Sequence, residues 1–437
     1  MALTTILSKT GSRFAEPFNF VFSSNLFAAG LGFLAVLLIS HKLSVAQFGL
    51  FSIALSVPRA LPSVITLGLD TSMTKLASSY LGRRDLHKAA EVVATTLRLR
   101  FFTATLAALL IFLTAQTVSI RIFHAPNLTP LLRIASLGVL FSSLLDYFKS
   151  VFWTYQWFKK SFFLQLAADS VKLCLILLFS VTGLLNTDVA VAAFSLAPAA
   201  GVLLGIRAIP KRPVLKTEPF RNLFLKLFSH SKWIFLAEAC RNLSAVAGLF
   251  LVATFMTPKA AGIYGLASNL TYLFPILLAS LKAVFLPHVA RFNEKKQFEQ
   301  FLKKSLNITL CAGLASIPLT FISGPVITFF FGARYNDAVP IFNALLLAYV
   351  VLTAHSSVQA ALYSLNKLFL VAIVDVSRLI LIAIGTYVLI PPLGLLAPPL
   401  VLLIVNLISF CFLFVYAFKV LQHKKTISAA DTDLFIF

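Results

Sequence analysis

Twelve stretches of this sequence are long and apolar enough to cross a lipid bilayer as helices. They cover residues 18–40, 46–69, 93–118, 129–150, 161–183, 188–209, 232–256, 261–288, 305–331, 338–363, 367–390 and 393–419. About 20 apolar residues are needed to span the hydrocarbon core, because a helix rises only about 1.5 Å per residue. In a chain of 437 residues this leaves little for a soluble domain, and only 12% of the side chains are charged. We therefore expect an all-α polytopic membrane protein with twelve transmembrane helices.

Lysine and arginine recur in every second connection between these stretches. The connections after the second, fourth, sixth, eighth, tenth and twelfth stretches are basic, and the longest of them lies at 210–231. The intervening connections hold single bases at most, such as Lys42 and Arg121. Because basic loops stay in the cytoplasm, this pattern predicts that both termini are cytoplasmic. It also accounts for the net charge of +22 without a nucleic-acid partner.

Two similar halves are indicated by acid–base pairs and by a shared glycine motif. Asp169 with Lys172 and Asp375 with Arg378 lie in matching apolar surroundings, and the two pairs are 206 residues apart. The segments 44–54 and 257–267 also match, with corresponding residues 213 residues apart. An even number of spans per half gives both halves one orientation, related by an axis along the membrane normal.

This repeat defines the expected organisation of the chain. We predict a six-helix half at 1–209, a basic cytoplasmic linker at 210–231, a second six-helix half at 232–420 and a cytoplasmic tail at 421–437. Ionisable residues inside membrane helices are costly and mark functional sites. Their presence in a repeated helical architecture is typical of a transporter.

The repeated segments also resemble a known family. Residues 43–57 with 67–70, and residues 257–268 with 286–287, are similar to the two half-patterns of Wzx-type polysaccharide flippases. These belong to the MOP superfamily, with the lipid II flippases and the MATE exporters. The resemblance implies two helical bundles around a central cavity in the bacterial inner membrane. It also implies movement of an undecaprenyl-diphosphate-linked oligosaccharide from the cytoplasmic to the outer leaflet by alternating access, for cell-surface polysaccharide biosynthesis.

Buried bases outnumber buried acids, which suits an anionic headgroup. Arg59, Arg241 and Lys282 are the candidates for binding the diphosphate. Arg59 lies between two prolines, and Arg241 lies nine residues beyond Lys232, about 14 Å into the membrane. The resemblance implies arginines on the first and eighth helices, but the first helix here carries Asn25 and two serines instead of a base.

Three pairs share a helix face because their members are three residues apart. They are Asp169 with Lys172, Glu238 with Arg241, and Asp375 with Arg378. Each pair either neutralises itself and fixes the helices, or supplies a carboxylate for coupling to H⁺ or Na⁺; both interpretations stay open. Asn25, His355 and Gln359 are candidates for glycan contacts, although His355 also suits an interhelical hydrogen bond. No catalytic residue, metal or cofactor is expected.

Two other functions are compatible with parts of the sequence. A MATE-like exporter of organic cations would need an acidic cavity, whereas the buried charges here are mainly basic. A glycosyltransferase would need sizeable outer loops with catalytic groups, and the predicted outer loops are short. The expected partners are the lipid-linked oligosaccharide, membrane lipids and other membrane proteins of polysaccharide assembly.

Overall fold

The computed structural model describes residues 15–208, 220–271, 295–364 and 367–423, and these ranges are helical with short connections and no strand. The helices are α2 (Ala15–Lys42), α3 (Val45–Ile65), α4 (Leu69–Gly82), α5 (Leu86–Arg121), α6 (Leu128–Thr154), α7 (Phe158–Val181), α8 (Thr187–Leu196), α9 (Pro198–Ala208), α10 (Phe220–Phe255), α11 (Pro258–Thr271), α13 (Lys295–Phe331), η1 (Ala333–Tyr335), α14 (Ala338–Ser364), α15 (Leu368–Leu393), η2 (Gly394–Leu396) and α16 (Ala397–His423). The helix that opens the second half thus begins at Phe220, within the stretch assigned to the linker.

Eight helical stretches of the described chain are long and apolar enough to cross a membrane, and one of them, Leu368–Val420, contains both α15 and α16. Two shorter apolar helical stretches, Leu26–Lys42 and Ser316–Phe331, add to these. The expectation of an all-α, multi-pass membrane protein is therefore confirmed. The second part of the predicted stretch 261–288 lies outside the described residues, and the number of twelve stays a prediction.

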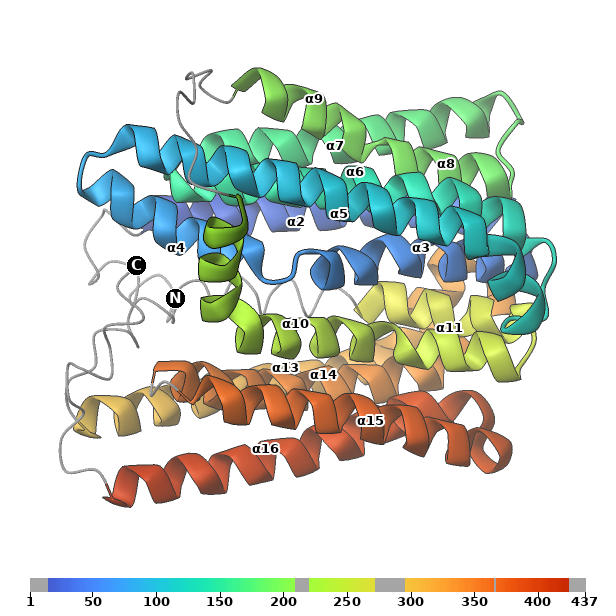
Figure 1. Ribbon diagram of the computed structural model, residues 1–437. Helices are drawn as coiled ribbons and strands as arrows, with labels where there is room; N and C mark the ends of the chain where they lie inside the picture. The colour runs from blue at the N-terminus through green and yellow to red at the C-terminus, as the bar shows by residue number, and fades with distance from the viewer. Residues whose placement is uncertain (1–14, 209–219, 272–294, 365–366, 424–437) are drawn as a thin grey trace.

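The helices lie side by side in one elongated bundle, with α2–α9 in its upper part and α10, α11 and α13–α16 in its lower part (Figure 1). The connections α2–α3, α5–α6, α7–α8, α10–α11 and α15–α16 lie together at the right-hand end of this view. We call this the Lys42 end, because α2 ends there at Lys42. The charge pattern of the sequence predicts that it faces away from the cytoplasm.

The start of α3 is fixed by its own sequence. The Ser44 hydroxyl accepts a hydrogen bond from the backbone N–H of Gln47, and the Gln47 side chain accepts one from the backbone N–H of Ser44. This reciprocal pair satisfies N–H groups that have no partner inside the helix. The motif singled out in the sequence therefore begins as a helix cap at the Lys42 end.

Helices α3 and α11 meet through backbone rather than side chains. A Cβ added at Gly49 would lie 1.9 Å from the Pro258 carbonyl oxygen, and one added at Gly262 would lie 2.0 Å from the Val45 carbonyl oxygen. The repeat exchanges these two contacts, because residue 45 corresponds to 258 and residue 49 corresponds to 262. Such a reciprocal contact is expected where a two-fold axis passes between identical surfaces. The axis inferred from the sequence therefore has a physical location, between α3 and α11.

The second predicted span does not continue as one helix to residue 69. Helix α3 ends at Ile65, and the backbone turns through the left-handed conformation at Leu67 (φ 50°) and Gly68 (φ 69°) before α4 begins. Pro58 and Pro62 within α3 remove two backbone donors and weaken the helix before the break. The apolar residues across 46–69 predict one continuous helix, but the prolines and the left-handed turn interrupt that helix.

Replacing Gly49 by Ala should destabilise the protein, because the added methyl group meets the backbone of α11 and forces the two helices apart. Overpacking of this kind costs about 1–3 kcal/mol. Thermal unfolding of the purified protein in detergent measures the effect. Gly30→Ala is the matched control, since no atom lies within 4 Å of its added Cβ; equal melting temperatures for the two variants would contradict the close contact.

Candidate functional site

Two adjoining cavities of about 310 and 330 Å³ lie in the first half of the bundle. They share six lining residues, which come from four helices: Arg59 on α3, Lys149 on α6, Gln165, Asp169 and Lys172 on α7, and Phe194 on α8. Residues of α2 and α11 complete the second cavity. Five polar side chains from α3, α6 and α7 therefore face one common space.

Arg59 reaches this space from a part of α3 that contains Pro58 and Pro62, both of which also line the first cavity. Its Nη1 donates a hydrogen bond to the side-chain oxygen of Asn269 at 2.6 Å. Asn269 belongs to α11, so a residue of the second half helps to orient the main cation of the first-half cavity. The structure thus places Arg59 at a cavity, and its binding of a diphosphate stays a prediction.

Helices α6 and α7 each supply an aspartate followed three residues later by a lysine. Lys149 Nζ lies 3.3 Å from Asp146 Oδ1, and Lys172 Nζ lies 2.5 Å from Asp169 Oδ1. Residues at this spacing share a helix face, so both pairs present acid and base together. With Arg59, three bases and two carboxylates line the first cavity among the described residues.

The Asp169–Lys172 pair has two further neighbours. Gln165 Nε2 donates to Asp169 Oδ2 at 2.9 Å, one helical turn before the aspartate. Lys172 Nζ lies 5.0 Å from the centre of the Phe194 ring, a distance at which an aromatic face attracts a cation. Asp169 is thus held firmly on α7, while the ammonium group lies between a carboxylate and an aromatic ring.

The repeat-related pair of the second half is buried more deeply and lines neither cavity. Asp375 is 0% exposed and Arg378 is 2% exposed, with 2.7 Å between Arg378 Nη1 and Asp375 Oδ1. Gln359 Nε2 donates to the other carboxylate oxygen at 2.7 Å, and Arg378 Nη2 donates to Asn406 Oδ1 at 2.6 Å. Asn406 in turn donates to the Ala348 carbonyl oxygen. These bonds tie α14, α15 and α16 together, so the pair stabilises the packing of these three helices.

The other sequence-based candidates lie near this buried network. Arg241 Nη1 donates a hydrogen bond to Gln359 Oε1 at 3.4 Å and so joins α10 to the buried network. Glu238, one turn earlier on α10, is exposed. Gln359 and His355 are each 1% exposed. Within the described chain, none of these four side chains lines either of the two cavities. Burial of His355 and Gln359 fits helix packing better than glycan contact.

Two candidates fall outside what the structure describes. Lys282 lies in the range 272–294, and the side chain of Asn25 is likewise not described, although its backbone belongs to α2. Their roles therefore stay predictions.

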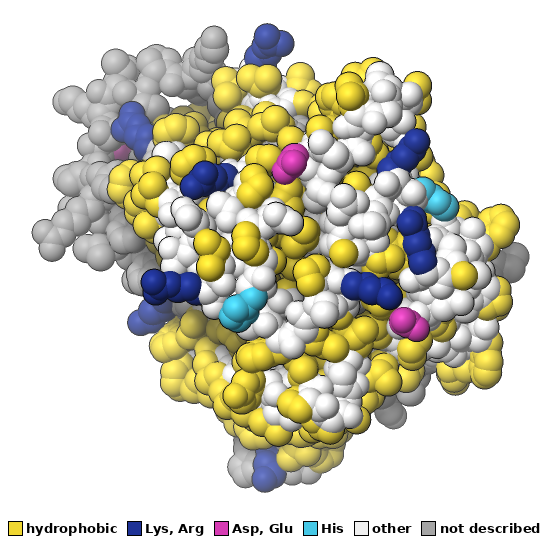
Figure 2. Space-filling view, turned by 90° about the vertical axis from the view of Figure 1, so that its right-hand side faces the viewer, with side chains coloured by type: hydrophobic (Ala, Val, Ile, Leu, Met, Phe, Trp, Pro, Cys, Tyr) yellow, Lys and Arg dark blue, Asp and Glu magenta, His cyan; other side chains and the backbone are white. Residues whose placement is uncertain are grey.

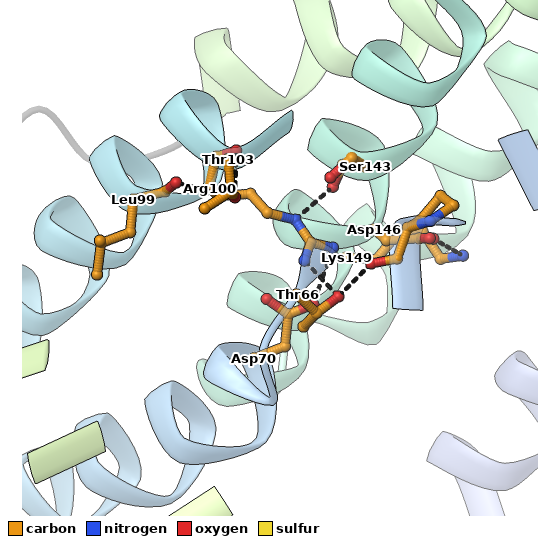
Figure 3. A network of polar contacts seen from close by, with 9 residues as sticks. Thr66, Asp70, Leu99, Arg100, Thr103, Ser143, Asp146 and Lys149 are labelled. Atoms are coloured by element: carbon orange, nitrogen blue, oxygen red, sulfur yellow. Dashed lines mark hydrogen bonds and ion pairs between the residues drawn. The ribbon is translucent and has the colours of Figure 1, made fainter. Parts of the chain in front are cut away.

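Sequence reasoning missed a buried arginine beside the α3–α4 break. Arg100 is 1% exposed; its Nε donates to the Ser143 carbonyl oxygen at 3.1 Å, Nη1 donates to the Thr66 hydroxyl, and Nη2 lies 3.3 Å from Asp70 Oδ2. Figure 3 shows the guanidinium reaching from α5 to Thr66 and Asp70, on both sides of the break, and to Ser143 on α6. Its position well inside the predicted stretch 93–118 was the signal that could have found it.

Lys149, Asp146 and Asn269 were also missed as cavity residues. Lys149 lies at the end of the predicted stretch 129–150, next to a basic connection, so its place in the sequence does not indicate a cavity residue. Helix α6 continues to Thr154, which brings Lys149 onto the wall of the cavity. Asn269 is uncharged, and only the crossing of α3 and α11 brings it near Arg59.

The Lys42 end is closed by contacts between the halves. Arg334, on η1 of the second half, donates to the carbonyl oxygens of Ser40 and Leu43, at the end of α2. His41 Nε2 lies 2.7 Å from the Phe330 carbonyl oxygen. Beneath these bonds, aromatic rings from both halves pack edge to face: Phe33 against Phe330 and Phe331, and Phe48 against Tyr335.

Figure 2 looks onto this end and shows scattered basic side chains among closely packed hydrophobic and neutral ones. Arg59 lies 14 residues beyond the start of α3, or about 20 Å along the helix from this seal. The cavity is therefore separated from the Lys42 end by a layer of interlocked side chains and backbone.

With the geometry in hand, comparisons with known proteins are informative. A family model described as "Polysaccharide biosynthesis protein" matches residues 42–340, more than half of the chain. No curated protein sequence matches.

Solved structures with the same fold include an inward-facing multidrug resistance MATE family transporter of the MOP superfamily (TM-score 0.75, 14% identity, covering 90% of this chain and 94% of that one). They also include the lipid II flippase MurJ in an inward closed conformation (TM-score 0.71, 18% identity, 94% and 88% covered). A Vibrio cholerae MATE transporter, VcmN, matches at TM-score 0.68 and 16% identity, with 97% and 99% covered. At these identities the likeness shows the fold alone, and this fold agrees with the resemblance noted in the sequence.

The two repeat-related pairs should respond differently to loss of their aspartates. Asp375→Ala leaves Arg378 buried without its carboxylate, a change that costs about 3–5 kcal/mol. Asp169→Ala leaves Lys172 beside a cavity, where water can solvate it, so the expected cost is smaller. Thermal unfolding in detergent should therefore show a much larger loss for Asp375→Ala, and the reverse order would contradict the assigned environments.

Proposed function

Because the chain belongs to the polysaccharide biosynthesis protein family of the MOP superfamily, we propose that it is a flippase for a lipid-linked oligosaccharide, in which a diphosphate joins the lipid to the sugar. It moves an undecaprenyl-diphosphate-linked glycan from the cytoplasmic to the outer leaflet of the bacterial inner membrane, for cell-surface polysaccharide biosynthesis. In this proposal the chain has twelve membrane helices and cytoplasmic termini, as the loop charges predict.

The observation that carries the proposal is the basic excess in the first-half cavity. Arg59, Lys149 and Lys172 converge on one space with two carboxylates, leaving one positive charge in excess among the described lining residues. A diphosphate offers several acceptor oxygens, and charge-assisted bonds from arginine and lysine are the strongest available to it. Arg59 is its primary ligand in this proposal.

The cavity walls also suit a ligand with a lipid part. Ala28, Ala29 and Gly32 of α2 border the second cavity. These small apolar residues give the isoprenoid chain a surface without polar groups, while the headgroup contacts Arg59. A volume of about 300 Å³ is within the range of small-ligand sites, so each cavity accommodates a headgroup rather than a whole glycan.

Alternating access follows from the closed Lys42 end. The bonds of Arg334 and the contact between α3 and α11 join the two halves on that side. Release of the substrate to the outer leaflet requires these contacts to separate while the halves close at the opposite end. Arg241 and Lys282 remain candidates to meet the substrate in another state, and Asp169 remains a candidate for coupling to H⁺ or Na⁺.

A second candidate function is a MATE-like exporter of organic cations. It is favoured by the two carboxylates, Asp146 and Asp169, that line the same cavity. Both are paired with lysines, which lowers their attraction for a cationic drug. Ethidium efflux that depends on either aspartate would support this alternative over the flippase.

A strain lacking this protein tests the proposed function directly. Undecaprenyl-linked glycan should accumulate on the cytoplasmic leaflet of that strain, and the intact gene should restore its delivery to the cell surface. Normal delivery without the protein would refute the proposal.

Arg59→Gln should weaken substrate binding, because it removes a charge-assisted hydrogen bond from the diphosphate. Such a bond corresponds to about a 10- to 100-fold loss of affinity, visible as a loss of surface glycan in the complemented strain. Arg133→Gln is the matched control, since Arg133 packs over Phe112 on α5 and lies outside both cavities. Similar transport by the two variants, at equal expression, would argue against Arg59 as a ligand.

Arg334→Ala should loosen the closed Lys42 end, because two helix-terminal carbonyl groups lose their donor. A cysteine placed at Ser142, which lines the first cavity, should then react several-fold faster with a membrane-impermeant thiol reagent added from outside. The experiment uses a protein whose four native cysteines are replaced by alanine. Arg121→Ala, at the end of α5, serves as control; unchanged labelling in Arg334→Ala would contradict a sealing role.

A further inference from the structure

A cavity proposed to bind an anion contains two carboxylates, and this needs a physical reason. Asp146 and Asp169 each lie one helical turn before a lysine that lines the same space. Both carboxylates therefore compete with an incoming phosphate for the same ammonium groups. An anion site without them would have three bases and a stronger attraction for phosphate.

The two pairs differ in how strongly they are coupled. Asp146 has a side chain 48% exposed and lies 3.3 Å from Lys149, so water weakens its attraction. Asp169 has a side chain only 8% exposed and lies 2.5 Å from Lys172. The second contact is the stronger competitor, because partial burial raises the strength of a charge–charge interaction.

The repeat-related pair in the second half gives the comparison that makes this arrangement specific. Arg378 and Asp375 have side chains 2% and 0% exposed, and Asn406 and Gln359 bind the outer sides of the two groups. No phosphate could reach that arginine without breaking the helix packing. Of these two pairs, only the first-half pair combines a tight contact with access to a cavity, so only that pair can meet a ligand.

Asp169 and Lys172 also differ in freedom to move. Gln165 holds the carboxylate on α7, whereas the lysine has a flexible four-carbon stem and a neighbouring aromatic face at Phe194. Among the described residues, the other charged groups that line the cavity with this pair are Arg59 from α3 and Asp146 and Lys149 from α6. When a phosphate enters, Lys172 can turn toward it and leave Asp169 bound to Gln165.

We propose that Asp169 is a competing anion built into the substrate site, which limits the affinity for the diphosphate so that the substrate is released after transport. The inference rests on the proposed function and deepens it. Asp169 is in this sense a positioning residue, because it acts on the substrate through Lys172. Binding that is too tight would hold the lipid-linked glycan in the cavity and slow each cycle.

Inorganic pyrophosphate binding to the purified full-length protein, measured by calorimetry, tests this. Asp169→Asn keeps the shape and the hydrogen bond with Gln165 but removes the charge, so affinity should rise about tenfold. Asp169→Glu keeps the competing charge and should stay near the wild-type value. Asp188→Asn, which removes a carboxylate at the Lys42 end in the first turn of α8, should leave the affinity unchanged.

A double-mutant cycle separates the proposed mechanism from a general change of charge. In a Lys172→Gln background, Asp169→Asn should no longer raise the affinity, because the lysine through which it acts is gone. Equal effects of Asp169→Asn with and without Lys172 would overturn the inference. Surface-glycan delivery by Asp169→Asn should also fall despite tighter binding, a combination that a purely structural role would not produce.

The outcomes distinguish this inference from the function on which it rests. Pyrophosphate binding that is weakened by Arg59→Gln but unchanged or weakened by Asp169→Asn would overturn the competing-anion role alone. Absence of pyrophosphate binding to the wild-type protein would overturn both. Tighter binding in Asp169→Asn, with a melting temperature close to that of the wild type, would support it.

Discussion

A charge placed inside a bilayer must either find an opposite charge or reach water, and much of this structure follows from that constraint. Asp375 and Arg378 are almost completely buried, and each is bound by its partner and by a neutral amide. Arg100 is buried as deeply and is bound by a carboxylate, a hydroxyl and a carbonyl group. These networks cross between helices, so the need to pair a charge also fixes how the helices pack.

The same constraint, satisfied differently, produces the candidate site. Asp169 and Lys172 have the spacing and helical context of Asp375 and Arg378, yet they border a cavity. A duplicated element thus has one enclosed version and one version that borders a cavity. The difference arises from the neighbours: Gln359 and Asn406 enclose the second pair, whereas the first faces Arg59 and Phe194.

The contact between α3 and α11 connects these local features to the whole molecule. Since Gly49 and Gly262 bring the two backbones together, Asn269 of α11 reaches Arg59 in the first half. Nearer the Lys42 end, Arg334 and the aromatic rings join the halves again. The interface between the two halves therefore closes the Lys42 end and also completes the cavity wall, so the seal and the cavity depend on the same pair of halves.

The sequence by itself determined the helical membrane fold, the family and the repeat, because apolar length, loop charge and residue spacing act locally along the chain. It also identified Arg59 and the two aspartate pairs as unusual, since a charge in an apolar stretch is visible in one dimension. It could not separate a pair that lines a cavity from one that is enclosed, nor find Lys149 and Asn269 as cavity residues. Those distinctions depend on which helices pack against which, and only the tertiary structure decides whether a buried charge meets a neighbouring side chain or open space.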